Sequence, residues 1–224
     1  MSIKILRKLF FILIYVLFSG CVKKDYKKMA ENYYKFALLE VEDGCSLIES
    51  SKRAIDCLDK AIQYDDRLNF HAIKASLLFR IGNYEEAKNC FEKIVGKCSD
   101  LKLCAEILNN YACLLCQIKE EDKALAIWKK LEVDKNYYTP EVALFNQAKM
   151  FLGKRDYKKA KELLVKASEI APDYLDAHYY LALIVIKYLK QYSFARSYVD
   201  RVLLLEPTHT GALKLDYFLK KQNV

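Results

Sequence analysis

Glycine and proline are scarce in this sequence, with six glycines and three prolines among 224 residues. Runs rich in glycine, proline or serine mark the linkers between domains, and no such run occurs here. A glycine-rich loop that would cradle a phosphate group is also missing. The composition therefore favours one continuous helical array without an obvious domain boundary.

Residues with the chemistry of an active site are few and far apart. The three histidines, His71, His178 and His209, are distant from one another in sequence, and none has metal-ligand spacing to a cysteine pair. Paired acids such as Glu85 and Glu86 fall where a helix would begin, and there they are ordinary first-turn residues. We therefore expect no catalytic, cofactor-binding or metal-binding residues, no small-molecule substrate and no enzyme activity.

The charge is positive but evenly spread along the chain. The formal net charge is +8, and removing Lys4, Arg7 and Lys8 leaves about +5 for the remainder. Lysines and glutamates are interspersed, which is typical of solvated helix faces. Binding to nucleic acid or to anionic lipid is the alternative, but it needs basic residues gathered on one face. No nucleic-acid partner is expected.

The first twenty residues have the pattern of a signal peptide. A positive segment with Lys4, Arg7 and Lys8 precedes an uninterrupted apolar run over Leu9–Phe18. That run is about half of the ~20 residues that a membrane-spanning helix needs. We therefore assign residues 1–20 to a cleaved signal peptide.

The end of this segment, Leu17-Phe18-Ser19-Gly20-Cys21, resembles a bacterial lipobox, in which the cysteine is acylated and becomes the new N-terminus. Phe18 departs from the pattern, because leucine, valine or isoleucine is usual there. The resemblance implies that lipid on Cys21 ties the protein to a membrane, since several acyl chains on one residue bind firmly. Ordinary secretion and an uncleaved anchor are the alternatives.

The second half of the chain repeats one pattern of two helices. Between residues 140 and 207, Ala160 and Ala195 each open a second helix, and Pro172 and Pro207 end it; both pairs are 35 residues apart. Two antiparallel helices approach closely only where a small side chain faces the partner. A two-helix repeat of this length resembles the tetratricopeptide family, whose arrays bury their apolar faces by stacking.

The same alanine recurs through most of the chain. Five second-helix alanines are spaced by 33, 37, 36 and 35 residues, namely Ala54, Ala87, Ala124, Ala160 and Ala195. This period predicts an all-α fold, an α-solenoid of antiparallel helix hairpins with about four to five tetratricopeptide-like repeats. We expect a tether and N-terminal helix over 21–48, the repeat array over 49–208 and a capping helix over 209–224.

The tetratricopeptide resemblance also indicates where a partner would bind. In such arrays the first helix of each repeat lines a concave groove, and the matching positions here are largely apolar or aromatic. A groove of that kind suits an amphipathic helix or an extended peptide, whereas the cations are too scattered for a clamp that grips a C-terminal carboxylate. The alternative is that neighbouring repeats or the N-terminal helix cover some of these residues. The candidate partner groove consists of Phe79, Arg80, Asn109, Phe145, Lys149, Tyr179 and Ile186.

Eight cysteines are present, and Cys21 is assigned to lipidation. Cys113 and Cys116 form a Cys-x-x-Cys pair, but they lie inside an apolar helix, away from a helix N-terminus that would lower a thiol pKa. Core or groove packing is favoured there over metal or redox chemistry. Cys98 and Cys104 flank a loop and are the candidate pair for a disulfide.

The middle of the chain carries a more specific resemblance. Asn109-Asn110-Tyr111-Ala112, then Tyr138-Thr139-Pro140 and residues 142–167, look like the type IV pilus biogenesis and stability lipoproteins of the pilotin type. The resemblance implies a membrane-anchored adaptor in envelope assembly, on the outer membrane facing the periplasm, with an outer-membrane secretin as partner. The alternatives are an accessory of outer-membrane barrel assembly, an adaptor for cell-wall hydrolases and an outward-facing lipoprotein that binds external ligands.

Overall fold

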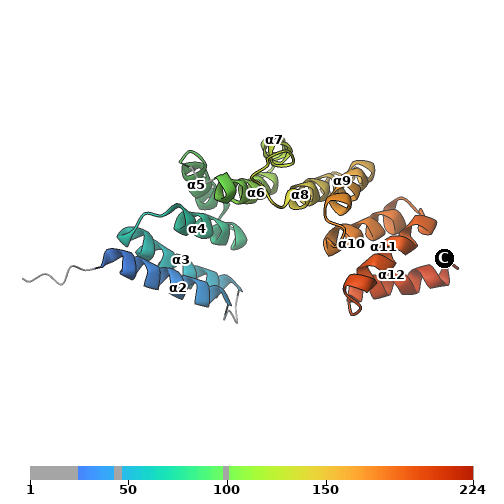
Figure 1. Cartoon of the computed structure of the whole chain (residues 1–224), viewed down its shortest axis with the longest axis horizontal. Coiled ribbons are helices and arrows are strands. Elements are labelled where there is room, and N and C mark those ends of the chain that lie inside the picture. Colours follow the sequence, from blue (N-terminus) through green and yellow to red (C-terminus); the bar gives the residue numbers. More distant parts are fainter. Residues whose placement is uncertain (1–24, 43–46, 98–100, 224) are drawn as a thin grey trace, which may run out of the picture. The chain divides into compact units, whose positions relative to one another are not determined.

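All regular elements in the described part of the chain are helices (Figure 1). The computed structural model describes residues 25–42, 47–97 and 101–223, so the expected signal peptide and Cys21 lie outside it. The predicted all-α class is confirmed. The bounds are α2 (Tyr26–Glu42), α3 (Leu47–Tyr64), α4 (Leu68–Arg80), α5 (Tyr84–Val95), α6 (Leu101–Gln117), α7 (Glu121–Leu131), α8 (Pro140–Gly153), α9 (Tyr157–Ile170), α10 (Leu175–Leu183), the π-helix η1 (Ile184–Tyr188), α11 (Tyr192–Leu205) and α12 (Thr210–Lys221).

The contacts divide the chain into two compact units, one that ends at Phe70 and one that begins at His71, within α4. In the first unit α2 packs along α3, so the N-terminal helix supplies the first member of a helix pair (Figure 1). Ala30 of α2 and Ala54 of α3 are both fully buried in this unit. Phe36 of α2 is 57% exposed and lies outside this packed contact.

The second unit continues with adjacent helix pairs, as an α-solenoid requires. Helix α6 packs on α7, α8 on α9 and α10 on α11. Helix α12 packs on α11 and α10, and Leu215 and Leu219 of α12 join the apolar core there. None of the helices in the described residues is both long and apolar enough to cross a membrane.

In each of the four successive helix pairs from α4 onward, both helices carry a fully buried alanine. The first helices contribute one fully buried alanine each, and so do the second helices, as the sequence period predicts. The pairs are Ala75 with Ala87, Ala112 with Ala124, Ala148 with Ala160 and Ala182 with Ala195, all with 0% exposure.

The turn between the two helices of a pair uses the same backbone conformation four times. The residue before each N-cap has a positive φ, namely Gly82 (83°), Lys119 (69°), Arg155 (61°) and Lys190 (57°). A left-handed residue at this place ends a helix by redirecting the chain, and glycine adopts it without a Cβ penalty. Three of the four turns form without glycine, which shows that the helix packing on either side outweighs a cost of about 1–2 kcal/mol.

The last repeat differs from the others by one residue. Its two contact alanines, Ala182 and Ala195, are 13 residues apart, whereas the other three pairs are 12 apart. The extra residue is accommodated in η1, where the Leu189 amide donates to the Ile184 carbonyl at 3.0 Å, five residues back. Single π turns of this kind are frequent at functional sites.

The alanine contact gives a direct test of the packing. In Ala160→Leu three extra carbon atoms enter a fully buried helix contact, and overpacking of that kind costs about 1–3 kcal/mol. We expect a lower melting temperature by circular dichroism with the helical signal retained at low temperature. Ala126→Leu is the control, because Ala126 is an exposed residue of α7. Equal melting temperatures for the two variants would contradict the close contact.

Candidate protein-binding surface

Side chains from three first helices surround a cavity of about 450 Å³, which we call the central hollow. Phe79 reaches it from α4, Cys113 from α6 and Met150 from α8, while Trp128 of α7 lies beneath. Such a cavity is large enough for one or two side chains of a bound segment. Its lining residues are Phe79, Cys113, Cys116, Gln117, Lys119, Glu121, Trp128, Asn146, Lys149, Met150, Gly153 and Lys154.

Charged groups of the central hollow have partners within the lining and outside it. Lys154 forms an ion pair with Glu121 at 2.6 Å, and the side chain of Lys149 lies 5.6 Å from the ring centre of Phe145. The two lysine heads lie at the rim, since both residues are exposed. The hollow therefore offers an apolar interior and a polar rim, which is the usual composition of a peptide-binding surface.

The two cysteines of the central hollow are structural thiols. Burial raises the pKa of Cys113 to about 11, and burial also raises the pKa of Cys116. Both thiols stay protonated at neutral pH, whereas a redox or metal-binding cysteine needs a lowered pKa. Cys104 is disulfide-bonded; Cys98, its expected partner, lies outside the described residues.

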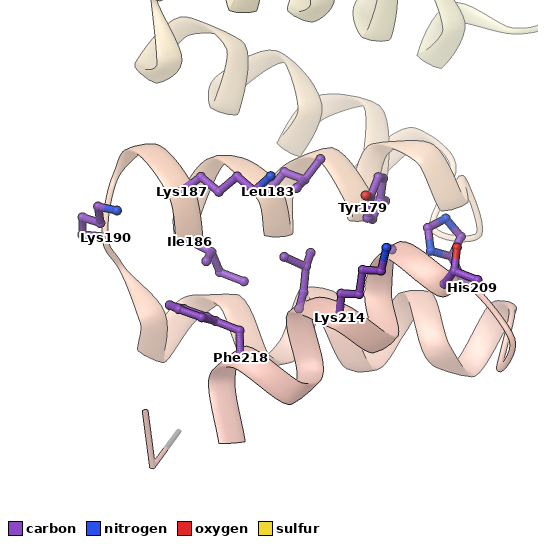
Figure 2. Close-up of a pocket in the computed structure, with 11 residues that line it drawn as sticks. Tyr179, Leu183, Ile186, Lys187, Lys190, His209, Lys214 and Phe218 are labelled. Carbon is purple, nitrogen blue, oxygen red and sulfur yellow. The ribbon is translucent and has the colours of Figure 1, made fainter. Parts of the chain in front are cut away.

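A second cavity, of about 620 Å³, lies between α10 with η1 and α12; we call it the C-terminal hollow (Figure 2). Its walls are apolar at Leu183, Ile186 and Phe218. Three lysines stand at its edges in Figure 2, two from the η1 side and one from α12. The complete lining is Tyr179, Leu183, Ile186, Lys187, Lys190, His209, Thr210, Gly211, Lys214, Leu215 and Phe218.

The predicted groove residues separate into two groups. Phe79 and Lys149 line the central hollow, while Tyr179 and Ile186 line the C-terminal hollow. These four remain our candidates for partner contact. Arg80 is exposed in the last turn of α4 and lines neither hollow.

Asn109 and Phe145 lie in the packed interior, 8% and 7% exposed, and neither lines a hollow. The Asn109 amide oxygen accepts hydrogen bonds from Trp128 Nε1 at 3.1 Å and from Asn146 Nδ2 at 3.0 Å. The Phe145 ring meets Tyr174 and Tyr180 edge-on, at 5.4 and 5.2 Å between ring centres. Neighbouring helices cover both side chains, which was the alternative left open by the sequence, and we do not propose them as partner contacts.

Sequence reasoning missed the contribution of α12. The segment after residue 208 was treated as a cap, yet Lys214 and Phe218 form one wall of the C-terminal hollow. The signal was available in the alternation of apolar Leu215 and Leu219 with lysines on the neighbouring face.

Comparison with known proteins supports the fold assignment. Residues 68–96 and 142–174 match the tetratricopeptide repeat family model. No curated protein matches the chain by sequence. Among solved structures, PilF of Pseudomonas aeruginosa has a TM-score of 0.70 at 22% identity, over 88% of this chain and 86% of that chain.

Two further solved structures are similar. PilW, described as a widely conserved type IV pilus biogenesis factor, has a TM-score of 0.67 at 18% identity, over 86% of this chain and 84% of that chain. YrrB, described as a tetratricopeptide protein with an unusual peptide-binding site, has a TM-score of 0.54 at 19% identity, over 87% and 98%. Identities of this size show the fold, and tetratricopeptide proteins are in general non-catalytic scaffolds for protein interaction.

Two adjacent asparagines, one buried and one exposed, allow a packing role to be tested against a surface position. Asn109→Ala leaves the buried indole N–H of Trp128 and the Asn146 amide without their acceptor, and an unsatisfied buried group costs about 1–3 kcal/mol. We expect a lower midpoint in urea unfolding. Asn110→Ala, at an exposed position, should leave the free energy of unfolding within about 0.5 kcal/mol of wild type. If Asn109→Ala unfolds at the wild-type midpoint, its hydrogen bonds carry no stability.

Proposed function

We propose that this protein is a lipid-anchored adaptor of the bacterial cell envelope that binds a segment of a protein partner in the hollows of its first helices. The central hollow is the observation that carries the proposal. Phe79 and Lys149 come from helices separated by about seventy residues, and both line one cavity with an apolar interior.

The chemistry of the central hollow suits a peptide with an apolar anchor. The floor offers Phe79, Trp128 and Met150, and the rim offers the Gln117 and Asn146 amides as hydrogen-bond partners. Buried aromatic or aliphatic anchors carry most of the affinity of such interfaces, while amides at the rim fix the register of the backbone. An enzyme site is not proposed, since the thiols that line the hollow are held protonated by burial.

Anchoring rests on the N-terminal sequence. The apolar run followed by Ser19-Gly20-Cys21 supports acylation of Cys21, and the lysines of residues 22–28 would then lie next to the lipid surface. An adaptor held this way stays close to membrane-embedded partners, which raises its effective concentration there.

The partner that we favour is the secretin of a type IV pilus. Support comes from the sequence resemblance to pilotin-type lipoproteins and from the fold shared with PilF and PilW over more than four fifths of each chain. Asn109 in the shared Asn-Asn-Tyr-Ala segment has a packing role here. The resemblance at that position therefore supports the fold more than the partner.

The test is affinity capture of the full chain from detergent-solubilised membranes of the cell that produces it. Wild type should be acylated, membrane-bound and associated with an outer-membrane secretin. Phe79→Ala should stay acylated and folded but lose most of the secretin, because truncation of an aromatic anchor costs roughly 2 kcal/mol or more. Cys21→Ser should lose the acyl label and leave the membrane fraction.

Phe194→Ala is the matched control, because Phe194 is 63% exposed and lines neither hollow. It should capture the secretin as wild type does. Membrane association of a processed Cys21→Ser protein would remove the lipid anchor from the proposal. Undiminished capture by Phe79→Ala would remove the central hollow.

A further inference from the structure

All the charged side chains that line the C-terminal hollow in the described residues are positive lysines. Lys187, Lys190 and Lys214 line it, and no aspartate or glutamate belongs to the described residues that do so. In the described part of the chain, none of these lysines lies within ion-pair distance of a carboxylate, unlike Lys154, which pairs with Glu121 at 2.6 Å. Three exposed lysines at the edge of one cavity make it electropositive, which favours an anionic occupant.

The interior between the lysines is apolar. In Figure 2 Ile186 of η1 and Phe218 of α12 point toward one another across the hollow, and Leu183 lies beside Lys187. Ile186 is nearly buried at 4% exposure, so the wall is firmly packed. A cavity with an apolar wall and a cationic edge fits a ligand with both characters better than a simple anion.

The extra residue of the last repeat lies in this wall. The π turn spans Ile184–Tyr188 and carries both Ile186 and Lys187, which line the hollow. Lys190 follows in the left-handed turn with φ of 57°. In the three other repeats the same stretch is regular α-helix, so the departure from the repeat coincides with the residues that would bind the ligand.

At one end of the C-terminal hollow, Tyr179 packs tightly against α12. The Tyr179 ring lies against the first turn of α12, where a Cβ on Gly211 would come within 2.4 Å of its hydroxyl oxygen. The His209 ring packs on Tyr179 at 4.6 Å between ring centres, and its Nδ1 accepts the Ala212 amide at 3.0 Å. Tyr179 is thereby held in place as a fixed aromatic wall.

We propose that the C-terminal hollow binds an acidic peptide segment of the partner, with an apolar side chain against Ile186 and Phe218 and carboxylates paired with Lys187, Lys190 and Lys214. The inference rests on the proposed adaptor function and names the chemistry that the partner must bring. The segment 22–28 of this chain is rich in lysine, so its charge excludes it as the occupant. An anionic lipid also joins an apolar chain to a charged headgroup, so binding to phosphatidylglycerol vesicles is the competing outcome in the test below.

The experiment measures fluorescence anisotropy of labelled peptides with the full chain in detergent. The probe is an eight-residue peptide with a central Leu-Phe pair flanked by three glutamates on each side, and the matched peptide has glutamine in place of every glutamate. We expect the acidic peptide to bind about tenfold more tightly than the glutamine peptide at low salt, and the difference to shrink as salt is added.

Two charge-reversed proteins locate the site. Lys187→Glu combined with Lys214→Glu should bind the acidic peptide at least about tenfold more weakly. Lys129→Glu combined with Lys130→Glu changes the same charge at two exposed positions of α7 outside the described cavities, and it should bind as wild type does. Equal circular dichroism spectra and melting temperatures of the two proteins show that the loss is local.

Three results would overturn the inference. They are equal binding of both peptides, an equal loss in both charge-reversed proteins, and binding to phosphatidylglycerol vesicles that abolishes peptide binding. If one of these results is obtained while capture of the partner still depends on Phe79, the acidic-peptide site is wrong. The proposed adaptor function is then unaffected. Loss of the Phe79 dependence itself counts against the proposed function instead.

Discussion

The burial of one alanine on each helix of a pair is the constraint on which the rest of the structure depends. Because Ala148 and Ala160 are fully buried with nothing beyond a methyl group, their helices approach closely and the larger side chains must pack beside them. Four residues after each second-helix alanine a large side chain fills that space, and all four are at most 1% exposed: Phe91, Trp128, Leu164 and Val199. A few positions therefore determine how the two helices of a pair pack. The opposite face of each first helix is available for side chains that bind a partner.

Departures from the repeat occur where function is proposed. The four turns share one backbone conformation even where Arg155 or Lys190 replaces glycine, so turn chemistry yields to the packing of the helices. The π turn is different, because one added residue in the last repeat changes which side chains reach the C-terminal hollow. A repeat array tolerates such an insertion, since each repeat contacts mainly its neighbours and the disturbance stays local.

The sequence predicted the helix pairs because alanine at a fixed spacing has a single packing explanation, and Ala87, Ala124, Ala160 and Ala195 all occupy it. The tetratricopeptide resemblance placed Phe79 and Tyr179 in a partner groove, and both line a hollow. It could not separate these from Asn109 and Phe145, which share the periodicity but are covered by Trp128 and by two tyrosines from other helices. That distinction depends on contacts between helices, which a period along one chain does not contain. The 13-residue spacing that marks η1 was visible in the sequence, but its consequence for the lysines required the packing of α12.

Site-specific photo-crosslinking in intact membranes tests most directly whether the hollows of the first helices meet the partner. A benzophenone amino acid is placed in turn at Phe79, Tyr179 and Phe194, the last being 63% exposed and outside the described cavities. The account predicts the same crosslinked partner from Phe79 and Tyr179, identified by mass spectrometry, with peptide attachment points in an acidic segment for Tyr179, and little product from Phe194. Crosslinks that form from Phe194 but from neither hollow would contradict it.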